Sequence, residues 1–315
     1  MATDLTIVIV NWNTRAQLRA CLSSLPTATT GLAVTTVVVD NDSHDGSAEM
    51  VRQEFPTCEL VATGSNLGFS RANNLALAQV DSDLILLLNP DTVCPPHSLT
   101  ALCDFLRSTP GAGAAGPTLL DAAGVPTASY GDFPAVRHHL AALLDPLGVW
   151  LPRRWREAGF GRIPRRGTSA GLVDYVKGAC LLMTRAALRE VGPLDERFFM
   201  YFEESDWCRR AQAAGFTVHH TGTSEIVHLE GGAAEQVNPF SLAQFQASYR
   251  HFVAKHYGPR WVWQFRAAQF AEYLGKGCLR WLAPGNRPSN RARARRHFAL
   301  ARLQLKPRLQ PRPPE

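Results

Sequence analysis

The first half of the chain alternates short apolar runs with stretches of helical spacing. The runs that predict strands are Leu5–Val10, Val34–Val39, Glu59–Ala62 and Leu84–Leu88. The stretches between them predict helices over Thr14–Leu25, where Pro26 should end the helix, from Ser43 or Asp45 to about Phe55, and over Ser70–Gln79. Continuous apolar strands that alternate with helices are typical of a sheet buried on both faces. We therefore expect an α/β fold with a mostly parallel central sheet and helices on both faces.

The second half has a less regular pattern. Residues 111–171 are rich in Gly, Pro and Arg, no element is predicted there, and the stretch 132–155 fits no pattern. A long irregular insertion of this kind is often functional. After it, strands are predicted over Phe216–His219 and Glu225–Leu229, with an ordered stretch at Val173–Thr184. Helices are predicted over Arg185–Val191, Glu203–Ala214, Phe240–Tyr257 and Pro259–Leu282, the last two amphipathic.

Composition and charge limit the class of protein. The chain has 315 residues, 45% of them hydrophobic, which is enough for a sizeable core. The formal net charge is +6, but nine of the 33 Lys and Arg residues lie in residues 286–315, so the rest of the chain is close to neutral. Seven cysteines without a Cys-x-x-Cys pair indicate reduced thiols rather than disulfides or a zinc site. Asp4 interrupts the N-terminus and no apolar run approaches the roughly 20 residues of a membrane span, so we expect a cytoplasmic chain.

Polar residues follow several of the predicted strands directly. They are Asn11, Asp40-Asn41, Asn66 and Asn89-Pro90-Asp91. Ligands of open α/β sheets bind outside the carboxyl ends of the strands, which makes these residues binding candidates. Taken alone, Asp40 fits an ordinary βα loop with a helix cap better than a nucleotide site.

The glycine-rich turn at residues 64–74 opens a predicted helix. Its glycines allow close approach of a ligand, and Arg71 and Asn73 could face a diphosphate at the helix N-terminus. The turn lacks both the Rossmann glycine spacing and the Walker lysine, so the signal is weak by itself.

Acidic residues lie at a strand exit and at a helix start. Asp91 is either a turn former or a Mg²⁺ or Mn²⁺ ligand whose remaining sites are filled by substrate phosphates. Glu203, Glu204 and Asp206 can favour the start of a helix electrostatically, or one of them can take a proton from a hydroxyl. His228, shortly before a double glycine, is either a structural histidine or an extra metal ligand.

Six motifs occur in an order that resembles one family. They are Ile9-Val10-Asn11-Trp12-Asn13, Val38-Val39-Asp40-Asn41 with Ser43 and Asp45-Gly46-Ser47, Asn66-x-Gly68-Phe69 with Ala72-Asn73-Asn74, Leu88-Asn89-Pro90-Asp91, Gly178-Ala179-Cys180-Leu181, and Phe198-Phe199-Met200-Tyr201-Phe202-Glu203-Glu204-x-Asp206. Over about residues 4–232 the chain resembles glycosyltransferase family 2, in its bacterial rhamnosyltransferase-like branch. The resemblance implies a GT-A fold, a nucleotide-diphosphate sugar donor, a divalent metal and inversion at the anomeric carbon. It also implies transfer of a sugar, with rhamnose a candidate, to a glycan or polyprenyl-diphosphate-linked acceptor in cell-envelope polysaccharide synthesis.

The same resemblance assigns roles to residues. Glu204 matches the catalytic base, with Glu203 and Asp206 beside it, although the family often has Asp at position 204. Asp91 and His228 match metal ligands, and Asn89 replaces the first acid of the family's Asp-x-Asp motif. Asp40 matches the residue that binds the nucleotide base. The full set expected to bind the nucleotide-sugar is Asn11, Asp40, Asn41, Asn66, Gly68, Arg71, Asn73 and Asn89.

The expected organisation follows from these assignments. Residues 1–235 form the catalytic domain, with a nucleotide-binding half over 1–110 and an acceptor and catalytic half over 111–235. A helical extension over 236–285 and a mobile basic tail over 286–315 follow. Residues 259–315 are basic and aromatic, so they are expected to bind an anionic membrane surface, or to pack on the domain or in a homodimer. No nucleic-acid partner is expected. The alternatives are a nucleotidyltransferase and a non-enzymatic protein that binds nucleotide-sugars.

Overall fold

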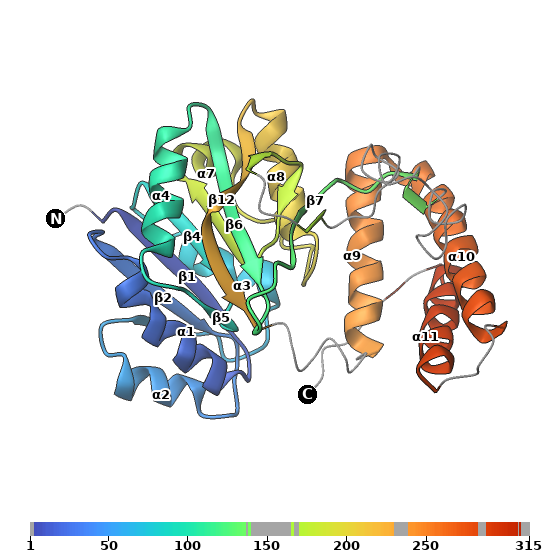
Figure 1. Ribbon diagram of the computed structural model, residues 1–315, viewed down its shortest axis with the longest axis horizontal. Coiled ribbons are helices and arrows are strands. Elements are labelled where there is room, and N and C mark those ends of the chain that lie inside the picture. The colour runs from blue at the N-terminus through green and yellow to red at the C-terminus, as the bar shows by residue number, and fades with distance from the viewer. Residues whose placement is uncertain are drawn as a thin grey trace. The chain divides into compact units, whose positions relative to one another are not determined.

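The computed structural model describes residues 3–136, 138–139, 165–166, 170–229, 239–282, 288–307 and 309. The chain divides into two compact units, which Figure 1 shows as an α/β unit and a helical unit. The first unit comprises Met1–Phe133 and Pro164–Gly231, and the second comprises Pro134–Ile163 and Gly232–Glu315. This division differs from the expected continuous domain over residues 1–235. At the described start of the second of these segments, the Tyr257 hydroxyl donates to the Pro134 carbonyl over 2.6 Å, which joins Pro134 to the helical unit.

Parallel strands form the first half of the central sheet. The strands are β1 (Leu5–Asn11), β2 (Val34–Asp40), β3 (Glu59–Ala62) and β4 (Leu84–Leu88). They lie in the order β3-β2-β1-β4 with parallel pairing throughout. The helices between them are α1 (Arg15–Ala28), α2 (Ser47–Glu54) and α3 (Phe69–Leu77). The predicted strands and helices of this half are present. Helix α1, however, continues to Ala28 because Pro26 lies in its last turn, where a missing N–H costs a single hydrogen bond.

The second half of the sheet is mixed. Strand β11 (Cys180–Thr184) runs antiparallel to β4 and to β6 (Ala112–Leu120), and β6 pairs parallel with β12 (Thr217–His228). The short strands β5 (Thr92–Val93) and β9 (Gly171–Leu172) pair antiparallel with β12. Strand β12 is continuous where two strands were predicted, with an irregular register between His220 and Glu225.

Strand β6 was missed by the sequence prediction. Its sequence is rich in Ala and Gly, which have a low tendency to form strands. Its glycines are explained by close packing against neighbouring side chains. A Cβ atom on Gly113 would lie 2.7 Å from the Phe216 side chain, and one on Gly116 would lie 2.7 Å from that of Val176. The Ala- and Gly-rich composition that makes β6 hard to predict from sequence is therefore what allows β6 to pack closely.

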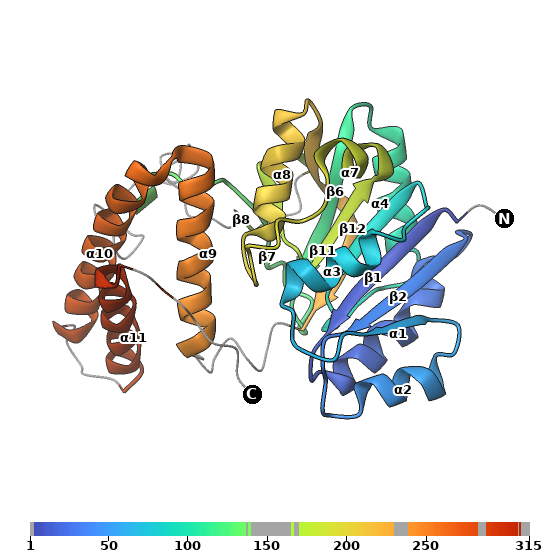
Figure 2. The same cartoon turned by 180° about the vertical axis from the view of Figure 1, so that it is seen from behind.

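Helices cover both faces of this sheet, as predicted. Helices α1, α2 and α4 (Ser98–Ser108) contribute to one hydrophobic cluster with β1, β4 and β11. Helices α3, α7 (Arg185–Val191) and α8 (Glu203–Ala213) lie on the other face, toward the viewer in Figure 2. A second sheet, of three strands, has the order β10-β7-β8, with β10 (Tyr175–Val176), β7 (Ala128–Gly131) and β8 (Arg165–Arg166). Strand β10 packs against α8.

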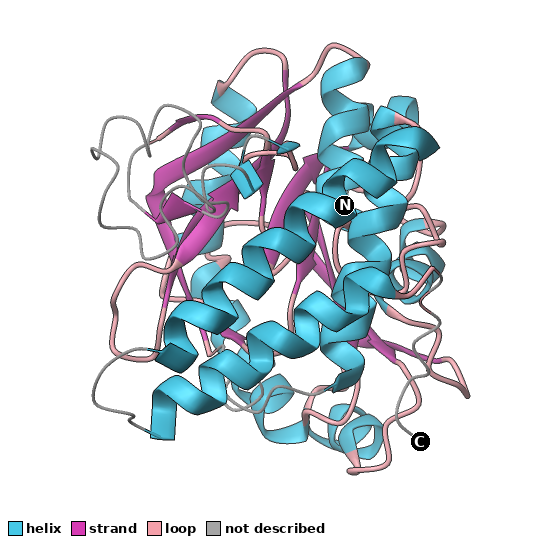
Figure 3. Ribbon diagram, turned by 90° about the vertical axis from the view of Figure 1, so that its right-hand side faces the viewer, coloured by secondary structure: helices cyan, strands magenta, loops and turns pink. Residues whose placement is uncertain are grey.

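The described part of the second unit is mainly helical. It contains α9 (Pro239–Tyr257), α10 (Pro259–Leu282) and α11 (Pro288–Leu305), and Figure 3 shows its long helices side by side. Part of the basic tail expected from residue 286 forms helix α11, and the mobility of that tail stays a prediction. Arg250 and Arg266 donate to the carbonyls of Leu303 and Gln304 over 2.6 and 2.9 Å, which satisfies groups that a helix end leaves unpaired. Among the described residues, no helix is both long and apolar enough to cross a membrane.

Candidate functional site at the carboxyl edge of the sheet

The ends of β1 and β2 hold a buried carboxylate. The parallel register places Asn11 beside Asp40, and the Asn11 amide donates to the Asp40 carboxylate over 3.4 Å. The backbone N–H of Ser43 donates to the other Asp40 oxygen over 3.1 Å. The Asn11 amide also donates to the Ser43 hydroxyl over 3.0 Å. Asp40 is only 4% exposed, so it is held in one orientation at the end of its strand.

Asparagine side chains tie the turn before α3 to the end of β2. The Asn41 amide donates to the Asn66 side-chain oxygen over 2.9 Å, and the Asn41 oxygen accepts from the N–H of Leu67 at 2.9 Å. The N–H of Gly68 donates to the Asn66 oxygen over 3.0 Å. Three of the predicted binding residues therefore form one connected network with the glycine turn.

The glycine turn also meets the loop that precedes α8. Gly68 has φ +79°, and a Cβ atom on it would lie 2.5 Å from the Phe199 carbonyl oxygen. The N–H of Phe69 donates to that same carbonyl over 2.6 Å. Only a glycine fits at this contact, which joins the predicted nucleotide half to the loop carrying the acids.

The three acids at the start of α8 have different surroundings. Tyr201 and Phe202, directly before them, both have φ 71°, a conformation that costs a non-glycine residue energy and is concentrated at functional sites. Asp206 is fully buried and pairs with Arg210 at 2.9 Å. Glu203 is 6% exposed, and its Oε2 atom has no hydrogen-bond partner among the described residues. Glu204 is the only one of the three that is partly exposed.

The two glutamates bind protons more strongly than ordinary carboxyl groups. Burial raises the pKa of Glu204, although the N–H groups at the start of its helix, the charge of Lys177 and the Ser205 hydroxyl oppose the rise. Burial, and then the charge of Glu204, raise the pKa of Glu203 well above its usual range. Since a higher pKa makes a carboxylate a stronger base, Glu204 is suited to accept a proton.

Asp91 and His228 come together across a strand pair. Strand β5 pairs with the end of β12 and places Thr92 opposite His228, so that His228 Nε2 lies 3.1 Å from Asp91 Oδ1. The two side chains are 6% and 31% exposed. Where the chain is described, no group of three or more His, Cys, Asp and Glu side chains is placed to hold a metal ion. A carboxylate and an imidazole together are metal-ligand types, and they would leave most coordination sites to a substrate and water.

The start of β11 lies between the Asn89-Pro90-Asp91 segment and Glu204. The N–H of Asn89 donates to the Ala179 carbonyl over 3.0 Å. A Cβ atom on Gly178 would lie 3.6 Å from Glu204 Cβ. The acids predicted from two distant motifs are thus linked through a third motif.

Two residues that were predicted to bind the donor are less closely connected to the rest of the candidate site. Arg71 is largely exposed, with its guanidinium 4.0 Å from Glu196. Asn73 is 1% exposed and donates to the Phe69 carbonyl over 2.9 Å. Its Oδ1 atom has no hydrogen-bond partner among the described residues.

Sequence reasoning missed several neighbours of Glu204. Tyr175 lies on β10 of the small sheet and Lys177 directly follows that strand, and the charge of Glu204 adds to the burial that raises the pKa of Tyr175. The two-residue strand β10 is too short to show a hydrophobic periodicity, so the sequence did not indicate that Tyr175 and Lys177 lie near Glu204.

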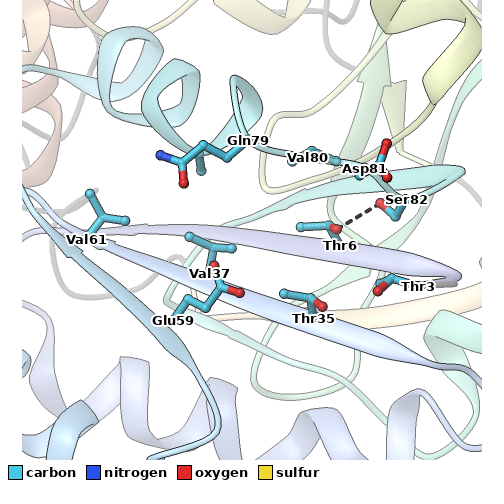
Figure 4. Close-up of a pocket in the computed structure, with 11 residues that line it drawn as sticks. Thr3, Thr6, Thr35, Val37, Glu59, Val61, Gln79, Val80, Asp81 and Ser82 are labelled. Atoms are coloured by element: carbon cyan, nitrogen blue, oxygen red, sulfur yellow. Dashed lines mark hydrogen bonds between the residues drawn. The ribbon is translucent and has the colours of Figure 1, made fainter. Parts of the chain in front are cut away.

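A pocket of about 280 Å³ lies away from these residues. Its lining includes Thr6 and Thr35 near the starts of β1 and β2, together with Ser82 before β4. Figure 4 shows the hydrogen bond of 2.8 Å between the Ser82 and Thr6 hydroxyls on its wall. The pocket therefore belongs to the amino-terminal part of these strands, opposite the candidate site.

The fold is that of GT-A glycosyltransferases. The structure is similar to the crystal structure of GalNAc-T7 with UDP, GalNAc and Mn²⁺, with a TM-score of 0.60 and 12% identity over 94% of this chain and 55% of that chain. This chain thus spans about half the length of that protein. It is also similar to the mannosyltransferase PcManGT from Pyrobaculum calidifontis in complex with GDP-Man and Mn²⁺, with a TM-score of 0.58 and 13% identity over 97% of this chain and 88% of that chain.

The chain belongs to the family described as glycosyltransferase like family 2, whose profile matches residues 2–283. It is 31% identical over 273 residues to the N-acetylglucosaminyl-diphospho-decaprenol L-rhamnosyltransferase of Mycobacterium tuberculosis, covering 83% of this chain and 87% of the relative. It is 26% identical over 200 residues to rhamnosyltransferase WbbL of Escherichia coli, covering 61% and 72%. The protein is therefore a glycosyltransferase, and the resemblance to the rhamnosyltransferase-like branch is confirmed.

Proposed function

We propose that the protein transfers a hexose, with rhamnose the first candidate, from a nucleotide-diphosphate sugar to a polyprenyl-diphosphate-linked sugar in cell-envelope polysaccharide synthesis. The observation that carries this proposal is the 31% identity, over 83% of the chain, to a transferase that acts on an N-acetylglucosaminyl-diphospho-decaprenol. The carboxyl-edge site supports it, because it combines a buried carboxylate, an Asp–His pair and a partly exposed glutamate.

In this proposal the donor lies across the ends of β1, β2 and β4. The fixed carboxylate of Asp40 accepts an N–H of the nucleotide base. Asn11, Asn41, Asn66 and Gly68 shape the surrounding loops, as their hydrogen bonds support. The further donor contacts expected from the family resemblance are Asn89, Arg71 and Asn73. Of these, the largely exposed Arg71 is the most accessible to a ligand.

Asp91 and His228 would hold a divalent metal ion, Mg²⁺ or Mn²⁺. Their proximity fits such an ion, because phosphate oxygens of the donor and water can supply the other ligands. When bound, the ion stabilises the negative charge on the departing diphosphate.

Glu204 is the proposed general base. It removes the proton from the acceptor hydroxyl, whose oxygen attacks the anomeric carbon from the face opposite the nucleotide, so that the configuration inverts. Burial and the charge of Glu204 raise the pKa of Glu203, which disfavours a second negative charge beside the base. The ion pair of Asp206 with Arg210 favours a supporting role for Asp206, in which it fixes the start of the helix.

A polyprenyl-linked acceptor lies in a membrane, so the reaction would take place at the membrane surface. We propose that the protein associates peripherally with the cytoplasmic face of that membrane. On α10, Trp263, Trp281 and Leu282 are 62%, 49% and 78% exposed. Arg291, Arg293, Arg295 and Arg296 on α11 are exposed as well. Each basic residue near an anionic leaflet contributes about 1 kcal/mol. The protein should float with anionic vesicles at low salt. Loss of flotation with neutral vesicles would show that the basic residues contribute to binding in addition to the aromatic side chains. Protein that stays at the bottom of the gradient with anionic vesicles contradicts the association.

Product analysis tests the central proposal. The purified protein is incubated with a panel of nucleotide-sugars and a short-chain diphospho-N-acetylglucosamine acceptor, and mass spectrometry follows the products. A gain of one deoxyhexose or hexose with release of a nucleoside diphosphate is expected. Release of pyrophosphate would indicate a nucleotidyltransferase, and binding of nucleotide-sugar with no product from any acceptor would favour a binding protein.

A further inference from the structure

The loop over residues 192–202 joins α7 to α8 and leads directly into the three acids. Its start is held by α8 itself, because the Arg210 guanidinium donates to the Pro193 carbonyl over 2.7 Å. Its end contains Tyr201 and Phe202, whose left-handed backbone conformations persist only where surrounding contacts impose them. Contacts to the middle of the loop are therefore needed to keep its end in place.

Helix α3 supplies such a contact through Asn74. The Asn74 amide donates to the Leu194 carbonyl over 2.9 Å, and the Asn74 side-chain oxygen accepts from the Leu194 N–H at 3.0 Å. The amide also donates to one carboxylate oxygen of Glu196 over 3.2 Å. Leu194 is 2% exposed, so both of its backbone groups need a partner within the protein. Asn74 pairs with both of them at once, as a neighbouring strand would.

An ion pair beside this contact is a weaker link. The guanidinium of Arg71, three residues before Asn74, lies 4.0 Å from the other carboxylate oxygen of Glu196. The two side chains are 60% and 53% exposed. Water and salt screen such exposed pairs, so they contribute little to stability. The hold of α3 on the loop therefore rests on Asn74 rather than on Arg71.

Asn73 and Asn74 are neighbours on α3 but face different surroundings, since successive residues of a helix point about 100° apart. Asn73 donates to the Phe69 carbonyl at the start of its own helix. Asn74 instead bonds to a residue 120 positions further along the chain. It thus connects the helix on the proposed donor side with the loop that carries the proposed base.

We propose that Asn74 is a positioning residue, which fixes the loop over residues 192–202 to α3 and so aligns Glu204 with the bound donor. This inference rests on the proposed function. Loss of the Asn74 contact leaves the donor side intact, because the hydrogen bond between Gly68 and Asn66 does not involve Asn74. It frees the middle of the loop and displaces the carboxylate. A misplacement of about 1 Å can lower a reaction rate on the order of 10²-fold.

The test uses Asn74→Asp, which keeps the shape of the side chain and an acceptor for the Leu194 N–H. The variant replaces the amide donor with an oxygen that faces the Leu194 carbonyl and the Glu196 carboxylate. We expect kcat to fall roughly 10–100-fold, while the equilibrium Kd for the nucleotide-sugar that gives product stays within about twofold. The matched control is Gln17→Glu, which adds the same charge to an exposed position of α1 and should leave both values unchanged.

A second measurement separates positioning of the base from a general loss of structure. Asn74→Asp is combined with Glu204→Gln, and the residual turnover of the double variant is compared with that of Glu204→Gln alone. Residues that act as a unit have non-additive effects, so Asn74→Asp should cause little further loss once the base is absent. A purely structural role would instead lower both the turnover and the denaturant midpoint in the Glu204→Gln background.

An unchanged kcat in Asn74→Asp would overturn the inference. So would a full further loss in the double variant, which would mean that Asn74 acts independently of Glu204. Weaker donor binding at unchanged kcat would make Asn74 a donor contact and would overturn it as well.

These outcomes differ from a failure of the proposed function. If Glu204→Gln is fully active, the proposed base is wrong and Asn74 has no base to position. If the unaltered protein uses an acceptor other than a diphosphate-linked sugar, the comparison is made with that acceptor. The expected result is then the same, because the position of the base affects transfer to any hydroxyl.

Discussion

Glutamates in the two units have opposite surroundings. At the start of α8, the Oε2 atom of Glu203 has no hydrogen-bond partner among the described residues, and burial raises the pKa of both Glu203 and Glu204. In the helical unit Glu272 is 8% exposed, but His139 donates to it or accepts its proton at 2.8 Å, and Lys276 pairs with its other oxygen. Burial would raise the pKa of Glu272, yet these partners outweigh it and lower the pKa.

We propose that this difference distinguishes a carboxylate that takes part in the reaction from one that stabilises the fold. A buried acid that keeps a raised pKa costs free energy, and such groups are concentrated at functional sites. A buried acid with matched partners stabilises the packing around it, and removing it leaves those partners uncompensated. The predictions below test this contrast from the largest expected effect to the smallest.

Replacing Glu204 with Gln should nearly abolish sugar transfer. The amide keeps the shape of the side chain but cannot take the acceptor proton, and general-base catalysis contributes about 10²–10⁴-fold. Turnover is measured beside equilibrium binding of the donor, which should be unchanged. The matched control is Glu203→Gln, which should keep most activity because burial and the charge of Glu204 disfavour the charged form of Glu203. The reverse pattern, with Glu203→Gln inactive and Glu204→Gln active, would move the base to position 203.

Removal of divalent metal should stop transfer, because the ion that Asp91 and His228 would hold supplies the positive charge that neutralises the leaving diphosphate. Activity is measured in excess EDTA and after addition of Mg²⁺ or Mn²⁺. Asp91→Asn should raise the metal concentration needed for half activity more than His228→Gln does, since it removes the charged ligand. Full activity in excess chelator would show that Asp91 and His228 have a role other than metal binding.

Replacing Glu272 with Gln should destabilise the protein by about 3 kcal/mol, because it leaves Lys276 buried without its carboxylate. The effect also has a defined pH dependence. A lowered pKa in the folded state stabilises the protein above the ordinary carboxyl pKa, and this stabilisation is lost as the pH falls through the folded value. The difference in denaturant midpoint from the unaltered protein should be full at pH 7 and shrink below about pH 4. A constant difference across that range would exclude ionisation as its cause.

Replacing Glu203 with Gln should have the smallest effect, and in the opposite direction. Its raised pKa means that the unfolded chain releases the proton more easily, so stability falls as the pH rises above about 4.3. The amide has no proton to lose, so the variant should be more stable than the unaltered protein at pH 7 and indistinguishable from it below about pH 4. Thermal unfolding at the two pH values measures this. A destabilised variant at pH 7 would mean that Glu203 is paired in a way that resembles Glu272.

The sequence by itself determined the parts of the fold that depend on local pattern. Strands β1, β2 and β4 are continuous apolar runs because both faces of the sheet are covered, and this pattern is visible without a structure. The acids of α8 likewise mark a helix start that the sequence shows directly. The order of the six motifs identified the family.

The tertiary structure decided which of these segments meet. Strand β6 escaped prediction because its glycines are selected by the neighbours Phe216 and Val176, which lie far away in the sequence. Helix α11 packs because Arg250 and Arg266 bind its end, a contact that composition cannot reveal. The contact of Gly68 with Phe199 and that of Gly178 with Glu204 depend on β11 lying between β4 and β6. Hydrophobic periodicity records whether a residue is buried, but not against which strand, so the composition of the site around Glu204 emerges only when the sheet is assembled.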